Sequence, residues 1–244
     1  TDALTLSLRF GLPNQWDVDV IVPWRHHYGG FTDNLISSWH RFFGLPDGNR
    51  DSYPTDALHY QLSQPEHDRR LIRSASGLGD IHVAVSRPVL AIDGGQLGIS
   101  VGVKTASGQS ADWLGSGATD VYALLRFSGQ QLGGWPLWWH GQVGGTRAGD
   151  SDLLGPEQKR SLWFAGLAAE WRFTPRWSAL IQYDGHSALL DGALEALGEP
   201  AGMLSMAVRW RPTAHWMIDA GFSEDVVVES APDITFLLNA RYVP

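Results

Sequence analysis

Side chains that could do chemistry recur at every second position along much of this chain. In 203–210, Ser205 and Arg209 alternate with the apolar Met206, Val208 and Trp210. Charged groups arranged in this way on many segments would face one common lumen. There they could select a polar solute by charge, or pair with one another as a structural network, because an unpaired buried charge is costly. We keep both interpretations open. The candidate lumen residues are Asp80, Lys104, Asp120, Arg126, Glu170, Arg172, Asp184, His186, Arg209 and Arg241.

Other chemistry is less well supported by the spacing of its residues. Five histidines between positions 25 and 77 lie near acidic residues, a mixture that can bind divalent metals, but no ligand spacing such as H-E-x-x-H occurs. His186 and Ser187 are adjacent, so on a strand they would point to opposite faces. We therefore predict no metal site, no cofactor and no catalytic residue. A lipid-modifying enzyme, with Glu224 and Asp225 placed near His186, stays as an alternative.

Glycines frame two short motifs, Gly-Leu-Gly-Asp at 77–80 and Gly-Ser-Gly-Ala-Thr-Asp at 115–120. Neither motif has the strand, loop and Lys-Ser/Thr helix start of a phosphate-binding loop. We interpret these glycines as sites of tight bends and bulges at the ends of strands, where a side chain would obstruct the backbone.

The composition excludes several classes of protein. The 244 residues contain no Cys, so a disulfide scaffold and a cysteine metal site are excluded. Twelve Trp and an aromatic content of 11% argue against disorder. A net charge of −8 disfavours nucleic acid as a partner, because phosphate is repelled. No apolar run of about 18 residues is present, so no membrane-spanning helix is predicted.

Period-two alternation predicts antiparallel strands long enough to cross a bilayer when tilted. We count eleven strong segments, at 3–10, 16–24, 80–86, 96–104, 119–127, 135–146, 163–173, 177–186, 203–210, 216–223 and 234–242. Short turns alternate with long connections, which is typical of an outer-membrane barrel. A soluble β-sandwich is the alternative fold. Because bacterial barrels have even strand counts, we expect about twelve strands (range 10–14), with the twelfth supplied by upstream sequence or by 57–63.

Aromatic residues flank the short turns. Four of these turns follow an Arg–aromatic pair and precede a Trp, as at Arg172-Phe173 and Trp177. This arrangement predicts an aromatic girdle at one membrane interface. Its members are Phe10, Trp16, Phe127, Trp135, Phe173, Trp177, Trp210, Trp216 and Tyr242.

We expect one domain over residues 1–244, in which 25–77 is a long external insertion. Within it, the spacing of Leu35, Ile36, Trp39 and Phe43 predicts an amphipathic helix over about 33–43. This helix could plug the lumen, cap its mouth or lie at the membrane surface. The pieces 57–62 and 69–73 could pair as a protruding hairpin.

Several of these motifs occur together in a known family. The two glycine motifs, Lys104 with Gly108, and Glu224-Asp225 followed by Pro-Asp-Ile-Thr-Phe at 232–236 resemble a proteobacterial outer-membrane β-barrel family classed as a domain of unknown function. The resemblance covers nearly all of the chain. One departure is that Val243 and Pro244 follow Tyr242, where such barrels usually end in an aromatic residue. Members carry further N-terminal sequence, which agrees with an upstream strand. The resemblance implies a fold and a compartment, and no particular activity.

These observations lead to one functional expectation. The chain is expected in the outer membrane of a Gram-negative bacterium, in contact with lipid, as a narrow passive channel for a small solute. Lys104, Arg126, Arg172 and Arg209 would act against Asp80, Asp120, Glu170 and Asp184. The alternatives are the lipid-modifying enzyme and a plugged structural or partner-binding barrel. The sequence makes no prediction of the oligomeric state.

Overall fold

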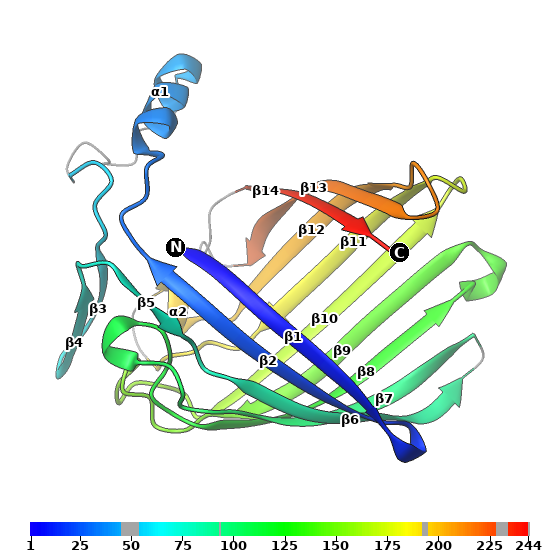
Figure 1. Cartoon of the computed structure of the whole chain (residues 1–244), viewed down its shortest axis with the longest axis horizontal. Coiled ribbons are helices and arrows are strands. Elements are labelled where there is room, and N and C mark those ends of the chain that lie inside the picture. Colours follow the sequence, from blue (N-terminus) through cyan, green and yellow to red (C-terminus); the bar gives the residue numbers. More distant parts are fainter. Residues whose placement is uncertain (45–53, 93, 192–194, 228–233, 244) are drawn as a thin grey trace.

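Antiparallel strands dominate the computed structural model, which describes all residues except 45–53, 93, 192–194, 228–233 and 244. Twelve strands form one sheet, which curls into a barrel-like wall (Figure 1). They are β1 (Asp2–Leu12), β2 (Trp16–His27), β5 (Ala75–Leu78), β6 (His82–Ile92), β7 (Gly95–Lys104), β8 (Asp120–Gln130), β9 (Leu137–Arg147), β10 (Ser161–Arg172), β11 (Trp177–His186), β12 (Ala201–Trp210), β13 (Trp216–Val227) and β14 (Thr235–Tyr242).

The path through the sheet follows the chain from each strand to the next. Its order is β1-β2-β6-β7-β8-β9-β10-β11-β12-β13-β14, and β5 also pairs with β2. β5 and β6 pair with consecutive stretches of β2, so they are two halves of one strand interrupted at 79–81. The prediction of an all-β antiparallel barrel with about twelve strands is confirmed.

Connections alternate between a turn end and a loop end of the wall. At the turn end, successive strands are joined by the 3₁₀ turn η1 (Pro13–Gln15), by a turn that includes Gly94, by the segment containing η4 (Leu132–Gly134), and by residues 173–176 and 211–215. At the loop end, the described parts of the longer connections are 28–44, 54–74, 105–119 with η3 (Ser110–Asp112), 148–160, 187–191 and 195–200 with α2 (Glu195–Gly198). Every second strand therefore runs from the loop end to the turn end.

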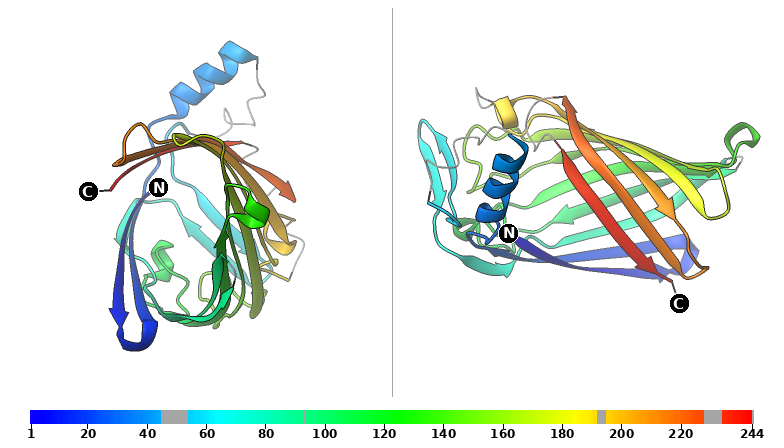
Figure 2. Two further views of the ribbon diagram at one scale, coloured as in Figure 1. Left: turned by 90° about the vertical axis from the view of Figure 1, so that its right-hand side faces the viewer. Right: turned by 90° about the horizontal axis from the view of Figure 1, so that it is seen from above.

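The two faces of the sheet are inverted relative to a soluble protein. Leu4, Leu6 and Leu8 on β1 are exposed on the outer face, beside outward residues of β2 such as Trp24. The most buried side chains of the strands include Ser100 and Ser178 on the inner face, which are at most 1% exposed. An apolar exterior with a polar interior suits a wall surrounded by lipid. Figure 2 shows the curvature that produces these two faces.

The edge strands of the sheet, called its outer strands below, are β1 and β14, and both run from the loop end to the turn end (Figure 1). In the part of the chain that the structure describes, these two strands form no hydrogen-bonded ladder with each other. Each therefore has a strand partner on one side only.

A separate hairpin covers part of the loop end. β3 (Tyr60–Gln64) and β4 (His67–Leu71) form their own two-stranded sheet. The expectation that 57–63 supplies a barrel strand is wrong, because β3 pairs with β4 alone, whereas the proposed hairpin is present. Leu62 and Leu71 are buried on the same face of the hairpin as His67. The His67 imidazole Nε2 lies 2.9 Å from the carbonyl oxygen of Leu153, in the loop 148–160.

Helix α1 (Asp33–Phe43) forms over the residues that its apolar spacing indicates, and ends at Gly44, whose φ of +66° is favourable for glycine. It stands beside the loop end and projects outside the wall (Figures 1 and 2). In this structure Leu35, Ile36, Trp39 and Phe43 lie outside the wall, because the short link from β2 carries the helix sideways, and a plug or cap role of the helix stays a prediction. Among the described residues, no helix is long and apolar enough to cross a membrane.

Candidate functional site: the lumen and its rim

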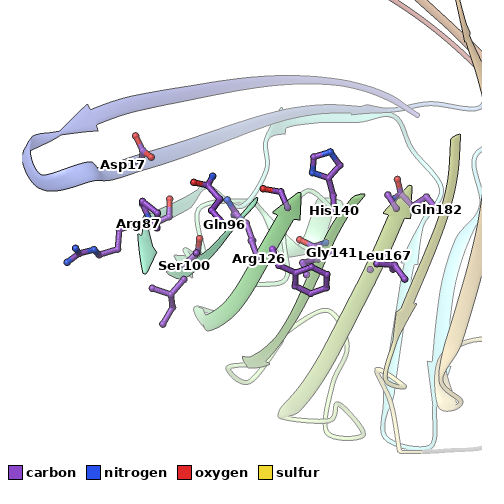
Figure 3. A pocket seen from close by; sticks show the side chains of 18 of the residues that line it. Asp17, Arg87, Gln96, Ser100, Arg126, His140, Gly141, Leu167 and Gln182 are labelled. Carbon is purple, nitrogen blue, oxygen red and sulfur yellow. The ribbon is translucent and has the colours of Figure 1, made fainter. Parts of the chain in front are cut away.

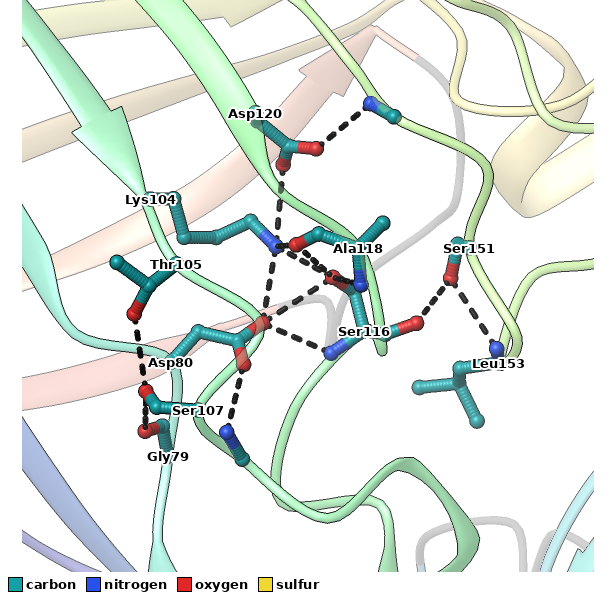
Figure 4. Close-up of polar contacts among 12 residues, drawn as sticks. Gly79, Asp80, Lys104, Thr105, Ser107, Ser116, Ala118, Asp120, Ser151 and Leu153 are labelled. Carbon is teal, nitrogen blue, oxygen red and sulfur yellow. Dashed lines mark hydrogen bonds and ion pairs between the residues drawn. The ribbon is translucent and has the colours of Figure 1, made fainter.

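A compact ion cluster lies at the loop end of the lumen, where β6, β7 and β8 meet their loops (Figure 4). We call Asp80, Lys104, Ser116 and Asp120 the rim cluster. The Lys104 ammonium lies 2.9 Å from Asp80 and 3.2 Å from Asp120, and donates to the Ser116 hydroxyl and to the Ala118 carbonyl. The register places Lys104 directly opposite Asp120, which is why the two side chains meet. All three ionised groups are largely buried.

The rim cluster fixes the loop 105–119 through backbone amides as well as through charges. Asp80 accepts hydrogen bonds from the backbone nitrogens of Gly108 and Ser116, at 2.9 and 2.8 Å. Burial raises the pKa of the Asp80 carboxyl, but the bonds from Ser116, Lys104 and Gly108 outweigh it, and the pKa is lowered overall. A side chain at Gly115 would lie 2.2 Å from the Asp80 carboxylate, so only glycine permits this approach. These contacts suit a structural lock.

A second network lies on the inner face near the turn end, on β10 to β13. We call Glu170, Ser178, Arg209, Arg211 and Asp219 the wall network. Arg209 lies 2.7 Å from Glu170 and 2.6 Å from Asp219, and Arg211 lies 2.5 Å from the other Glu170 oxygen. The Ser178 hydroxyl donates to Glu170 at 2.7 Å. Both Glu170 oxygens are therefore occupied, and its charge is compensated by two guanidinium groups.

Arg172 lies at the edge of the wall network. Its guanidinium is 4.0 Å from Glu170 and stacks at 4.3 Å over the Trp138 ring, a cation–π contact. The charge of Arg172 is thus partly satisfied by an aromatic face.

Between the rim cluster and the turn end, the inner face encloses a cavity of about 400 Å³. It is lined by residues of β1, β2 and β6 to β11, many of them amides, hydroxyls and ionisable groups. Figure 3 shows Gln96, His140 and Gln182 pointing into the space that the sheet encloses. A cavity of this size lies at the lower end of the range of small-molecule sites.

The cavity is also lined by charged residues that belong to neither the rim cluster nor the wall network. Arg126 lies opposite Gly98 and Gln142 in register, and no carboxylate among the described residues lies within ion-pair distance of it. Asp184 accepts a hydrogen bond from the Gln182 amide at 2.5 Å and likewise has no ion-pair partner in the described ranges. Among the described residues, Arg126 and Asp184 therefore carry charges that no ion pair offsets, whereas the charges of Lys104 and Arg209 are paired.

Two further lumen candidates lie away from the cavity. His186 is exposed at the loop-end terminus of β11, where its ring Nδ1 lies 2.9 Å from the Ser187 carbonyl oxygen. That contact is with the backbone and does not activate a hydroxyl. Arg241 is exposed on the outer strand β14, opposite Met217.

The girdle candidates gather at the turn end, as their place next to the short turns requires. Trp177 and Trp210 are stacked with centroids 5.8 Å apart, and Trp216 contacts Tyr242 at 5.2 Å. Phe127 is half-buried against Gly141, whereas the other members are exposed: Phe10, Trp16, Trp135, Phe173, Trp177, Trp210, Trp216 and Tyr242. Arg87 stacks on Trp16 at 5.1 Å, which places a cation at the same level.

The histidines of 25–77 are dispersed among separate contacts. His26 stacks on Tyr28 at 4.9 Å, and the buried His27 contacts the Thr1 hydroxyl and the Trp113 carbonyl. In the described ranges, no group of three or more His, Asp or Glu side chains is arranged to hold a metal.

Sequence reasoning missed three residues that complete these clusters. Arg211 and Ser178 belong to the wall network, and Ser116 belongs to the rim cluster. Arg211 lies two positions after Arg209, so continuing the period-two pattern by one step would have placed it on the inner face. Ser178 could have been found in the same way from Gln182.

The comparisons with known proteins agree with this architecture. A family model described as "Protein of unknown function (DUF3187)" matches residues 1–243. The chain belongs to this family. No curated protein matches.

Several solved structures are similar to this family member, and the first of those named here shares its fold. The COG4313 outer membrane channel from Pseudomonas putida F1 is similar with a TM-score of 0.57 at 16% identity, over 98% of this chain and 81% of that chain. A Pseudomonas aeruginosa FadL homologue gives 0.48 at 13% identity, over 98% and 65%. OmpT of Vibrio cholerae gives 0.45 at 10% identity, over 98% and 88%. The fold is that of outer-membrane β-barrels.

Proposed function

We propose that this chain forms a narrow passive channel for small polar solutes in the outer membrane of a Gram-negative bacterium. The observation that carries the proposal is the polar cavity inside an apolar-faced wall, lined by charges that have no ion-pair partner among the described residues. The similarity in fold to a protein described as an outer membrane channel supports the same function.

The structure narrows which charges would act on a solute. Lys104 and Arg209 each contact two carboxylates, so their fields are largely cancelled within the protein. Arg126 and Asp184 lack such partners among the described residues, and they line the same cavity. We therefore assign charge selection to Arg126 and Asp184, and assign the rim cluster and the wall network to holding the lumen in shape.

Two opposite charge removals test this proposal. In planar bilayers, R126Q should raise the permeability ratio of cations to anions, and D184N should lower it, because each removes one sign of charge from the cavity. The measurement is the reversal potential across a salt gradient. R70Q is the matched control, since Arg70 lies on the exposed hairpin and pairs with Asp68 at 3.0 Å.

Failure of charge selection and failure of the channel give different results. A shift of the same sign in R126Q and D184N, or an equal shift in R70Q, would contradict selection in the cavity. A folded, membrane-inserted chain that conducts no ions would contradict the channel itself.

A further inference from the structure

Helix α1 carries an apolar surface that no other described part of the chain covers. Its stripe consists of Leu35, Ile36, Trp39, Phe42 and Phe43, at the spacing of one helical face. Leu35 is 69% exposed and Phe42 is 81% exposed. The aromatic rings contact one another: Trp39 and Phe43 have centroids 4.5 Å apart. A contiguous exposed patch of this kind marks an interaction surface.

The opposite face of α1 is turned toward the chain itself. Asn34, Ser37 and Arg41 line a polar groove together with residues such as Tyr28 and Tyr60. At the start of the helix, the Asp56 backbone nitrogen donates to the Asp33 carboxylate at 2.8 Å. These contacts fix the roll of the helix about its axis, so that the apolar stripe faces away from the protein.

The position of α1 relative to the wall indicates what lies beside the stripe. The helix follows β2 directly, at the loop end, and extends sideways beyond the wall (Figure 2). The outer face of the wall at the same end carries exposed Trp24, Leu78, Trp163 and Tyr183. The stripe therefore continues an apolar, aromatic surface that faces lipid when the barrel spans a membrane.

We infer that α1 is an interfacial anchor that lies in the loop-side surface of the bilayer, with its stripe inserted among lipid chains. Eleven residues give a helix about 16 Å long, enough for three turns parallel to the surface. Its ionisable side chains are few and of both signs, Asp33, His40 and Arg41, so burial of Trp and Phe, and not attraction to charged headgroups, drives the contact. Because the barrel already holds the helix next to the bilayer surface, the helix inserts without a separate encounter with the membrane. The inference rests on the proposed location in a membrane.

The absence of cysteine from the sequence makes a direct test possible. Single cysteines are introduced as F42C in the stripe, N34C on the opposite face of α1 and I181C on the outer face of β11, where Ile181 is exposed. Each is labelled with a nitroxide in phosphatidylcholine nanodiscs. Collision with oxygen reports exposure to lipid, and collision with a water-soluble nickel complex reports exposure to water. We expect F42C and I181C to favour oxygen, and N34C to favour nickel.

Each other outcome has a definite meaning. If I181C reports lipid but F42C reports water, the anchor is overturned while the membrane barrel stands. If I181C itself reports water, the membrane location fails. If F42C is shielded from both reagents, the stripe is covered by protein, such as a second copy, and lipid is the wrong occupant.

Discussion

At the scale of single residues, the same charge type has different roles according to its partners. Lys104 contacts two carboxylates, a hydroxyl and a carbonyl, whereas Arg126 contacts no carboxylate among the described residues. The amino-acid pattern assigns both residues to the inner face with equal weight. Only the register and the loops decide that Lys104 is enclosed by two carboxylates and that Arg126 is left without a carboxylate partner among the described residues.

The rim cluster should be sensitive to loss of its central cation. K104M leaves Asp80 and Asp120 buried without a counter-charge, so we expect a loss of about 3–5 kcal/mol in the free energy of unfolding, which denaturant titration of the folded barrel measures. The control is K159M, because Lys159 pairs with a largely exposed Asp191 and should matter little. Equal effects of the two changes would show that the cluster does not stabilise the loop end.

Acid should release the same loop. Because the pKa of Asp80 is lowered in the folded state, its stabilisation is complete above the ordinary carboxyl pKa and is lost as the pH falls through the lowered value. Pepsin cleavage within 105–119 should therefore accelerate between about pH 5 and about pH 2, in the range where carboxyls titrate. The D80N variant should be cleaved readily throughout this range. If D80N and the unmodified chain show the same pH profile, Asp80 does not control the loop.

At the scale of elements, alternation predicts the strands well, because one face must contact lipid and the other must not. It does not predict which charges pair. Arg209 reaches Glu170 across β11, a contact set by the register of three strands and by the small Ser178 between them. Likewise, amphipathic spacing predicts that 33–43 is a helix, but its position depends on the links at its ends. The spacing therefore does not predict placement: the strand expected at 57–63 lies outside the barrel sheet, and α1 lies beside the wall.

The hairpin β3–β4 should unfold independently of the wall. Leu71 is 2% exposed beneath the hairpin, and its neighbour Ile72 is 72% exposed. L71A should destabilise the hairpin by about 2–5 kcal/mol through the cavity it creates, and should accelerate proteolysis within 54–74. I72A is the matched control and should leave the rate unchanged. Proteolysis of L71A at the rate of the unmodified chain would show that the hairpin does not depend on this packing.

At the scale of the whole molecule, the strands of the wall differ in how completely their backbone is hydrogen-bonded to neighbouring strands. β8 pairs along its length with β7 and β9, whereas β1 and β14 each pair on one side only in the described structure. Amide hydrogen exchange of the chain in nanodiscs should therefore be slowest in 121–125 and fastest, among the strands, in β1 and β14. Uniform protection across all strands would show that the outer strands are paired in the membrane.

Because β1 and β14 run in the same direction, they cannot pair with each other as antiparallel strands. A wall of strictly alternating strands closes with a uniform hydrogen-bond pattern only if its outer strands run in opposite directions. Where β1 and β14 meet directly, they can join only as a parallel seam, with slanted and slightly weaker bonds. An antiparallel closure instead requires an odd number of strands between them. The line between β1 and β14, and not any hairpin, is therefore where a closed form of this wall would open first.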